Sequence, residues 1–184
     1  MGVISSNATW LREFSYLAPT GFPLMFAVLG GWWAVGAFPA PVYSFASTPR
    51  QFTRDIVALT VLIDVSQTML HRLAHTRLRH TIFGRSHAVH HKNTHPKPED
   101  AFYTGVVDAL FQLIMPLLVV VHCTRPSRGA LVVFGCGYSW WLNFLHSPPA
   151  QYPRLRRLGL VTPADHQLHH REPTRNFSNI LAWL

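Results

Sequence analysis

Histidine is the residue type whose number and spacing stand out in this chain. Twelve of the 184 residues are histidine, and nine of them form three clustered patterns and one isolated position. Residues four apart on a helix share one face, so His71 and His75 can direct both imidazoles at one metal ion. An HxxHH block turns its last histidine about 100° from the one before it, so one block can serve two adjacent ions. The nine residues are His71, His75, His87, His90, His91, His146, His166, His169 and His170.

The chemistry that this set favours is metal binding. A structural zinc ion takes four ligands, so nine imidazoles are too many for one ion and suit two. Imidazole nitrogen binds iron, zinc and copper alike, so the pattern alone does not identify the metal. A single HxxxH pair arises by chance on many helices, but two HxxHH blocks, one such pair and a further histidine do not. A zinc or nickel store is the less favoured interpretation, because storage tracts are loose and low in complexity.

Four polar residues are candidates for holding these imidazoles in place. Asp64 lies two helical turns before His71 on the same stripe, where a buried carboxylate can accept the second ring N–H of a ligand. Asp108, with Gln112 four residues later, lies inside an apolar stretch, where a carboxylate marks either a functional site or a helix–helix contact. Asp165 precedes the last histidine block and either orients a ligand or caps a helix. The candidates are Asp64, Asp108, Asn143 and Asp165.

Four nearly charge-free stretches must supply the helices that position the histidines. A helix that spans a membrane needs about 20 apolar residues, and the second stretch reaches that length only if it begins near Phe52 or is partly buried by its neighbours. Charged residues make up 13% of the chain, against about 25% in a typical soluble protein. This composition excludes a disordered chain, and it favours a membrane bundle over a soluble helical core. The stretches are Phe22–Phe38, Ile56–Leu70, Ala101–Val121 and Gly129–Ser147.

Basic residues are distributed unequally between the loops. Of the 16 Lys and Arg residues, 12 lie before the first stretch, as Arg12 does, or after the second and fourth stretches. The opposite side holds only Arg50, Arg54, Arg125 and Arg128. Positive charge stays on the cytoplasmic face of a membrane. We therefore expect an all-α, multi-pass bundle of about four spanning helices with a cytosolic, histidine-rich helical cap. The net charge of +8 is then an orientation signal, and no nucleic-acid partner is expected.

Taken with these motifs, the sequence resembles the fatty acid hydroxylase / sterol desaturase superfamily of integral-membrane, histidine-rich di-iron oxygenases. The resemblance rests on the histidine blocks and the apolar stretches around them. It extends to Asp100-Ala-Phe-Tyr-Thr-Gly, Asn143-Phe-Leu-His146-Ser and Asn176-Phe, and it covers about Asp64 to Leu184. Residues 1–50 add only hydrophobicity, so we expect a single domain over 1–184 with its histidine-motif core at 51–184.

The resemblance implies two iron ions, held by the nine histidines, and dioxygen as co-substrate. It also implies a lipid substrate of the fatty acyl, sphingolipid or sterol type, and hydroxylation or desaturation as the reaction. Electrons would come from a separate protein, cytochrome b5 or a similar donor, at the endoplasmic reticulum membrane. Members commonly supply one more ligand histidine, for which His95 and His122 are candidates.

Two alternatives to this function remain at the sequence level. A membrane protein that binds or transports metal would line its spans with ionisable residues, but only Asp64 and Asp108 lie there. An inactive or shortened member is the other alternative, because Pro148-Pro149 replaces a Gly-aromatic pair and the chain stops at Trp183-Leu184. Four aromatic residues either wall a dry site or anchor helices in lipid; these are Phe111, Trp140, Trp141 and Phe144.

Overall fold

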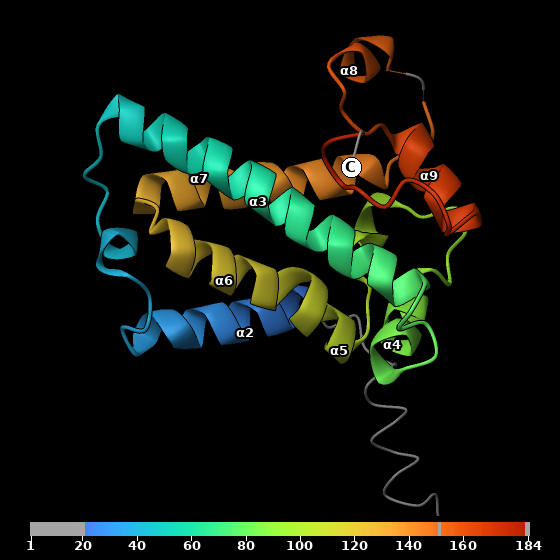
Figure 1. Cartoon of the computed structure of the whole chain (residues 1–184), viewed down its shortest axis with the longest axis horizontal. Coiled ribbons are helices and arrows are strands. Elements are labelled where there is room, and N and C mark those ends of the chain that lie inside the picture. Colours follow the sequence, from blue (N-terminus) through green and yellow to red (C-terminus); the bar gives the residue numbers. More distant parts are fainter. Residues whose placement is uncertain (1–20, 151, 183–184) are drawn as a thin grey trace, which may run out of the picture.

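The long helices lie side by side, and the short ones gather at one end of them (Figure 1). The structure, a computed structural model, describes residues 21–150 and 152–182, and its regular structure there is helical apart from one isolated bridge between Leu160 and Leu181. The bundle consists of α2 (Gly21–Ala34), α3 (Pro49–His75), α5 (Val106–Asp108) continued by the π-helical η3 (Ala109–Ile114) and α6 (Met115–Thr124), and α7 (Arg128–Leu145). The short helices are α4 (Ile82–His90), α8 (Pro153–Arg157) and α9 (Pro163–Arg171), and the 3-10 turns are η1 (Ala40–Tyr43) and η2 (Pro98–Phe102).

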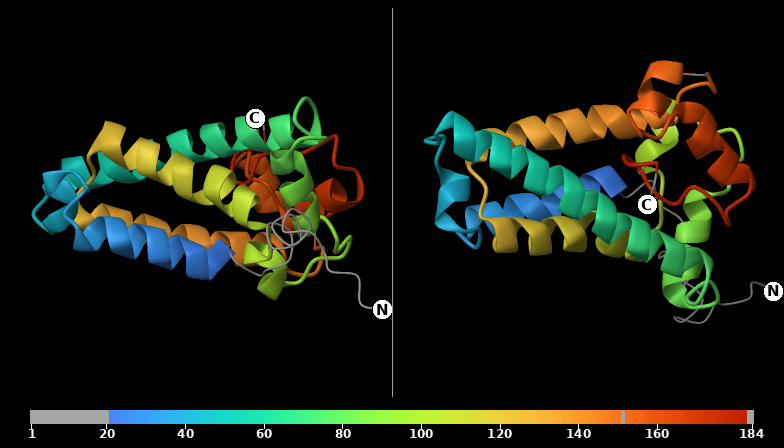
Figure 2. Two further views of the ribbon diagram at one scale, coloured as in Figure 1. Left: turned by 90° about the horizontal axis from the view of Figure 1, so that it is seen from below. Right: turned by 45° about the horizontal axis from the view of Figure 1, so that its top comes forward.

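The two ends of the bundle differ in what they contain. The histidine end, as we call it, carries α4, α8, α9 and the last turns of α3 and α7, whereas the far end carries η1 and the connection from α6 to α7 (Figure 2). The all-α prediction is thus confirmed for the described part of the chain. Residues 1–20, which include Arg12 of the charge count, lie outside that part, as do Trp183 and Leu184.

Two helices are long and apolar enough to span a membrane. They are the 27-residue α3 and the 19-residue run Val106–Thr124. Within the most apolar 18 residues of each, only 33% and 39%, respectively, are buried inside the protein. The second stretch is long enough because α3 begins at Pro49, where Thr48 and Gln51 form a capping box. Among the described helices, α2 and α7 do not combine the length and the hydropathy that a span requires. α2 is too short, with 14 residues, and polar and glycine residues lower the mean hydropathy of α7. Two of the four predicted spans therefore have this support.

The far end is held together by a hydrophobic core and by one buried carboxylate. Leu59, Ile63, Val121 and Phe134 pack together there from α3, α6 and α7. Asp55 of α3 accepts a hydrogen bond from the backbone N–H of Ser127 at 2.9 Å, and Ser127 in turn caps α7. These contacts fix the spacing of α3 and α7, and so the separation of the histidines that each helix carries at its other end.

Candidate metal centre

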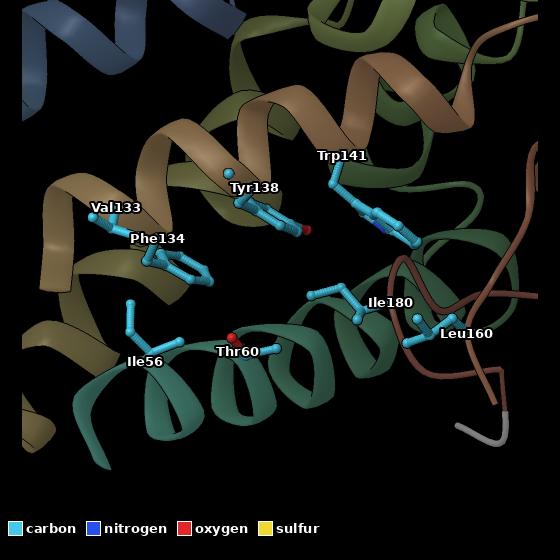
Figure 3. A pocket seen from close by; sticks show the side chains of 9 residues that line it. Ile56, Thr60, Val133, Phe134, Tyr138, Trp141, Leu160 and Ile180 are labelled. Carbon is cyan, nitrogen blue, oxygen red and sulfur yellow. The ribbon is translucent and has the colours of Figure 1, made fainter. Parts of the chain in front are cut away.

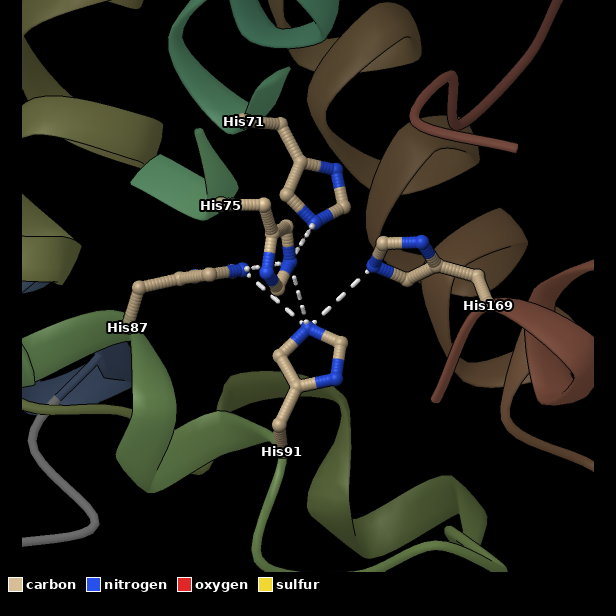
Figure 4. A group of neighbouring side chains, drawn as sticks. All are labelled: His71, His75, His87, His91 and His169. Atoms are coloured by element: carbon tan, nitrogen blue, oxygen red, sulfur yellow. Dashed lines mark hydrogen bonds between the residues drawn. The ribbon is translucent and has the colours of Figure 1, made fainter. Parts of the chain in front are cut away.

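The structure brings the nine histidines together into two adjoining groups at the histidine end. Within each group, one ring nitrogen per residue lies within 4.8 Å of all the others. The groups adjoin where the ring of His91 lies 4.6 Å from the ring of His170, centroid to centroid. Figure 4 shows how the imidazoles of the larger group converge from separate helices. The five-histidine group is His71, His75, His87, His91 and His169, and the four-histidine group is His90, His146, His166 and His170.

The helices that carry these residues end or begin at the site. α3 supplies His75 from its last turn and His71 from the turn before it, and His146 is the C-cap of α7. α4 packs tightly on the chain that precedes it, because a Cβ on Gly84 would lie 2.4 Å from the carbonyl oxygen of Leu78. This close approach requires glycine and sets the distance between the histidines of α4 and those of α3. Pro163, at the first position of α9, starts the helix that carries the last block.

The nitrogen–nitrogen distances fit the shell of an ion. In the five-histidine group, the Nε2 atom of His91 lies 3.0 Å from that of His75, 3.1 Å from that of His87 and 3.2 Å from that of His169. In the other group, the Nε2 atom of His146 lies 3.2 Å from that of His166. Two nitrogens that each lie about 2.1 Å from one ion are about 3.0–3.4 Å apart at square or tetrahedral angles. The residues therefore fit one metal ion in each group.

The second ring nitrogen of six histidines faces an oxygen acceptor. Because a carbonyl or carboxylate oxygen can only accept, Nδ1 carries the proton and Nε2 presents its lone pair to the centre. In the five-histidine group, Nδ1 of His71 donates to the carbonyl oxygen of Phe177 (2.7 Å), Nδ1 of His87 donates to Oδ1 of Asp108 (3.0 Å), and Nδ1 of His169 donates to the carbonyl oxygen of Arg175 (2.6 Å). In the four-histidine group, Nδ1 of His90 donates to the carbonyl oxygen of Tyr103 (3.1 Å), Nδ1 of His146 donates to that of Leu142 (2.7 Å), and Nδ1 of His170 donates to that of Asn93 (3.1 Å). The Nε2 atom of His170 is buried without a hydrogen-bond partner, as a metal-ligating nitrogen would be.

Burial keeps the imidazoles neutral. Burial, with nearby histidines as a smaller cause, lowers the pKa of His170 to about 3. Burial also lowers the pKa of His169, to about 4. The pKa values of His90 and His166 fall well below 6.5, again mainly through burial. All four side chains are therefore neutral near pH 7, and neutral imidazole is the form that binds a metal.

Asp64 supports the site by a route that the sequence did not predict. Its buried carboxylate accepts no histidine N–H; it accepts hydrogen bonds from the Ser178 hydroxyl (3.0 Å) and from backbone N–H groups, the shortest from Leu181 (2.8 Å). We call residues 175–181 the C-terminal strap. This strap contains the carbonyls of Arg175 and Phe177 that orient two of the five histidines. Asp64 therefore acts on the imidazoles through the strap.

The other three candidates differ in how close they are to the histidines. Asp108 pairs directly with His87, as one of its two predicted roles requires, and also accepts from the Thr104 hydroxyl. Asn143 donates to the carbonyl of Ser139 at 2.7 Å, within α7. Asp165 forms a capping box with Thr162 at the start of α9 and pairs with Arg156 at 2.9 Å. Asp165 thus takes the capping role of its two predicted roles.

The two candidates for a tenth ligand lie outside both groups. His95 is exposed, and its Nδ1 atom lies 3.2 Å from the hydroxyl of Thr94. His122 lies at the far end, where its Nε2 atom is 3.1 Å from the carbonyl oxygen of Ala37. Neither residue therefore extends the set of nine.

A cavity of about 60 Å³ lies beside the histidines. Its lining combines histidines of both groups with apolar side chains, such as Leu113 and Leu142, and with Gln67, Gln112 and Asn179. The Nε2 atom of Gln112 is buried and lacks a hydrogen-bond partner. Of the four aromatic residues, Trp140 is exposed by 65% and Phe111 by 41%, which favours the lipid-anchoring role for these two. The part played by Asn179 is set by tertiary contacts, so no local sequence pattern pointed to it.

Comparisons with known proteins agree with the chemistry of the site. Residues 56–184 match the family model described as "Fatty acid hydroxylase". The chain is 32% identical over 169 residues to a protein of Phaeodactylum tricornutum named "Alternative squalene epoxidase". The alignment covers 90% of this chain and 47% of that protein, so the chain spans about half the length of this relative. No solved structure matches the chain.

Proposed function

Because the chain belongs to the fatty acid hydroxylase family, we propose that it is a membrane di-iron oxygenase that inserts oxygen into, or desaturates, a lipid. The observation that carries the proposal is the pair of adjoining histidine groups, whose neutral imidazoles have the spacing of ligands around two ions. When bound, two irons would activate dioxygen, which is the oxidant, for attack on an unactivated C–H bond. An oxygen insertion would place one oxygen atom in the lipid and release the other as water, with two electrons and two protons from a separate donor.

The protein's own residues would bind, orient and dehydrate the centre. The nine imidazoles would hold the ions. Asp108 and the C-terminal strap fix ring planes of the five-histidine group through Nδ1, and backbone carbonyls do so in the four-histidine group. The adjacent cavity has Leu113 and Leu142 in its wall, and an apolar wall keeps water away from a reactive centre. The unpartnered amide of Gln112 can donate a hydrogen bond to an oxygen atom that the substrate carries.

The membrane location forms part of the same proposal. α3 and the run Val106–Thr124 are candidate spans, and the side chains of Val57, Val119 and Val132 are exposed by 52–56%, as lipid-facing residues are. We propose that α2 and α7 complete four spans. Arg77, Arg85 and Arg154 lie in or beside the short helices of the histidine end, and this excess of positive charge supports a cytosolic orientation of that end. The endoplasmic reticulum as the membrane is proposed from the family alone.

The experiment for this function is product formation by the purified protein with a reductant, dioxygen and a panel of lipids. Squalene comes first because of the relative's name, and fatty acyl, sphingolipid and sterol substrates follow. We expect oxygenated or desaturated product that requires both dioxygen and electrons. His90→Ala and His169→Ala, one from each histidine group, should abolish it, while His95→Ala should not. Product that forms equally in both ligand variants, or bound divalent metal that exchanges freely with no turnover of any lipid, would contradict the proposal.

A further inference from the structure

An apolar groove runs between α3 and α7, on the outside of the bundle (Figure 3). It has a volume of about 290 Å³ and is lined by apolar side chains such as Ile56, Phe134 and Trp141. Leu160 and Ile180 close the groove at the histidine end. The groove thus follows the bundle axis and points toward the metal centre.

Exposed apolar side chains surround the opening of this groove. Val133 of α7 lines it, and Val57, Val61 and Val132 each follow or precede a lining residue in the sequence; these four valines are 39–56% exposed. α3 is also one of the two candidate spans. Exposed apolar patches mark contacts with membranes or with other proteins. In the proposed membrane location this surface would face lipid, so a hydrocarbon chain could enter from the side without crossing water.

A single layer of polar side chains separates the groove from the histidine cavity. Tyr138 lines the groove, and its hydroxyl donates to the side-chain oxygen of Gln67. The amide of Asn179 donates to both of these oxygens, each at 3.3 Å. Gln67 and Asn179 line the cavity that contains the histidines. The groove and the metal centre therefore lie on opposite faces of one hydrogen-bonded layer.

The α7 side of the groove contains open space at a glycine. Gly137 lines the groove, and a Cβ built on it would meet no atom within 4 Å. Gly135 on the same helix has equally open surroundings but does not line the groove. A larger residue at position 137 would fill the groove without displacing the fold, and the same residue at position 135 would leave the groove open.

We propose that this groove binds the hydrocarbon chain of a membrane lipid and that Gln67, Tyr138 and Asn179 form the partition between that chain and the metal centre. The inference deepens the proposed function, because it names where the substrate chain is held before it reaches the histidines. Because its lining is apolar and it opens toward lipid, the groove would favour a hydrocarbon chain over a polar headgroup. The partition admits the chain only when its hydrogen bonds open.

The test is photolabelling of the full chain in nanodiscs with a fatty acid that carries a diazirine in mid-chain. Gly137→Leu is compared with Gly135→Leu, two substitutions that have the same effect on helix propensity. We expect label on the segments of Trp141 and Ile180 to fall about tenfold in Gly137→Leu, because displacing two methylene groups from the groove costs about that factor in affinity. Label in Gly135→Leu should match wild type, and label near Val119 of α6 should be the same in all three proteins.

Equal labelling of the groove in Gly137→Leu and Gly135→Leu would overturn the inference, as would wild-type groove label no higher than label near Val119. Metal content, measured on the same preparations, separates this result from a failure of the proposed function. Metal and turnover without groove labelling would reject the groove alone. Groove labelling that depends on position 137, in a protein without bound metal, would reject the oxygenase proposal and leave the groove as a lipid site.

Discussion

The two histidine groups are alike in their convergent nitrogens but differ in what holds their rings. The five-histidine group depends on two buried carboxylates, directly on Asp108 and, through the C-terminal strap, on Asp64. In the four-histidine group, the oxygens that face Nδ1 are backbone carbonyls. A carboxylate partner raises the basicity of a ligand imidazole and fixes its orientation. The comparison indicates that the loss of a carboxylate charge would change the metal affinity of the two groups differently, although the groups adjoin.

The largest expected difference follows from Asp108→Asn. This change removes the charge that faces Nδ1 of His87, so metal affinity of the five-histidine group should fall about 10–100-fold. The four-histidine group should keep its affinity. Metal titration followed by elemental analysis checks this: at the free metal concentration that just saturates both groups of wild type, the variant should hold about half of the wild-type content. A parallel loss from both groups would show that the two are not separately supported.

A smaller loss is expected for Asp64→Asn, because Asp64 acts through the strap. The variant should lower metal affinity of the five-histidine group by less than Asp108→Asn does, and should cost about 1–3 kcal/mol of stability by weakening buried hydrogen bonds. Asp55→Asn is the matched control. Asp55 is an equally buried aspartate on the same helix that accepts a backbone N–H at the far end.

Asp55→Asn should lower stability to a similar extent with unchanged metal content. If both variants lost metal in proportion to their stability, the strap would have no specific role in orienting His71 and His169. Urea denaturation in detergent provides the stability, and elemental analysis provides the metal content.

The smallest effect is the pH dependence of the metal-free protein. Burial holds the pKa of His169 at about 4 and that of His170 at about 3, below the value of about 6.5 of an unfolded histidine. The unfolded state therefore binds more protons below pH 6.5, and stability must fall as the pH is lowered from about 6.5 toward 4. His169→Gln and His170→Gln, one from each group, should reduce this dependence by similar amounts. A thermal-denaturation series that shows no pH dependence in the metal-free protein would contradict the assignment of neutral, buried imidazoles.

Sequence reasoning predicted which histidines converge better than it predicted their hydrogen-bond partners. Spacing on helices selected eight of the nine histidines, because i, i+3 and i+4 positions share a face whatever the tertiary fold. His146 has no histidine near it in sequence and was included for its place at the end of the fourth apolar stretch. The neighbours His90 and His91 enter different groups, which agrees with the prediction that one block can serve two ions. Which histidine joins which group depends on how α4 packs on α3 and α5 and on how α9 packs on α7, and no local pattern encodes that packing.

The role of Asp64 illustrates the same limit. Its partners lie more than 110 residues later in the chain, so a helical-face argument pointed to the nearer histidines instead. The start of α3, by contrast, was encoded locally in Thr48, Pro49 and Gln51, a signal that extends the helix beyond the apolar stretch. Asp165 was also local, because a carboxylate three residues into α9 completes a capping box.

The measurement that tests the central claim most directly is the iron content of the purified chain after anaerobic reconstitution. It compares wild type with His75→Ala, His166→Ala and His95→Ala. The two histidine groups predict about two irons per chain in wild type and in His95→Ala, and a loss of iron in each of the other two variants. One iron or less in wild type, or iron content that is the same in all four proteins, would contradict a two-ion centre built from these nine histidines.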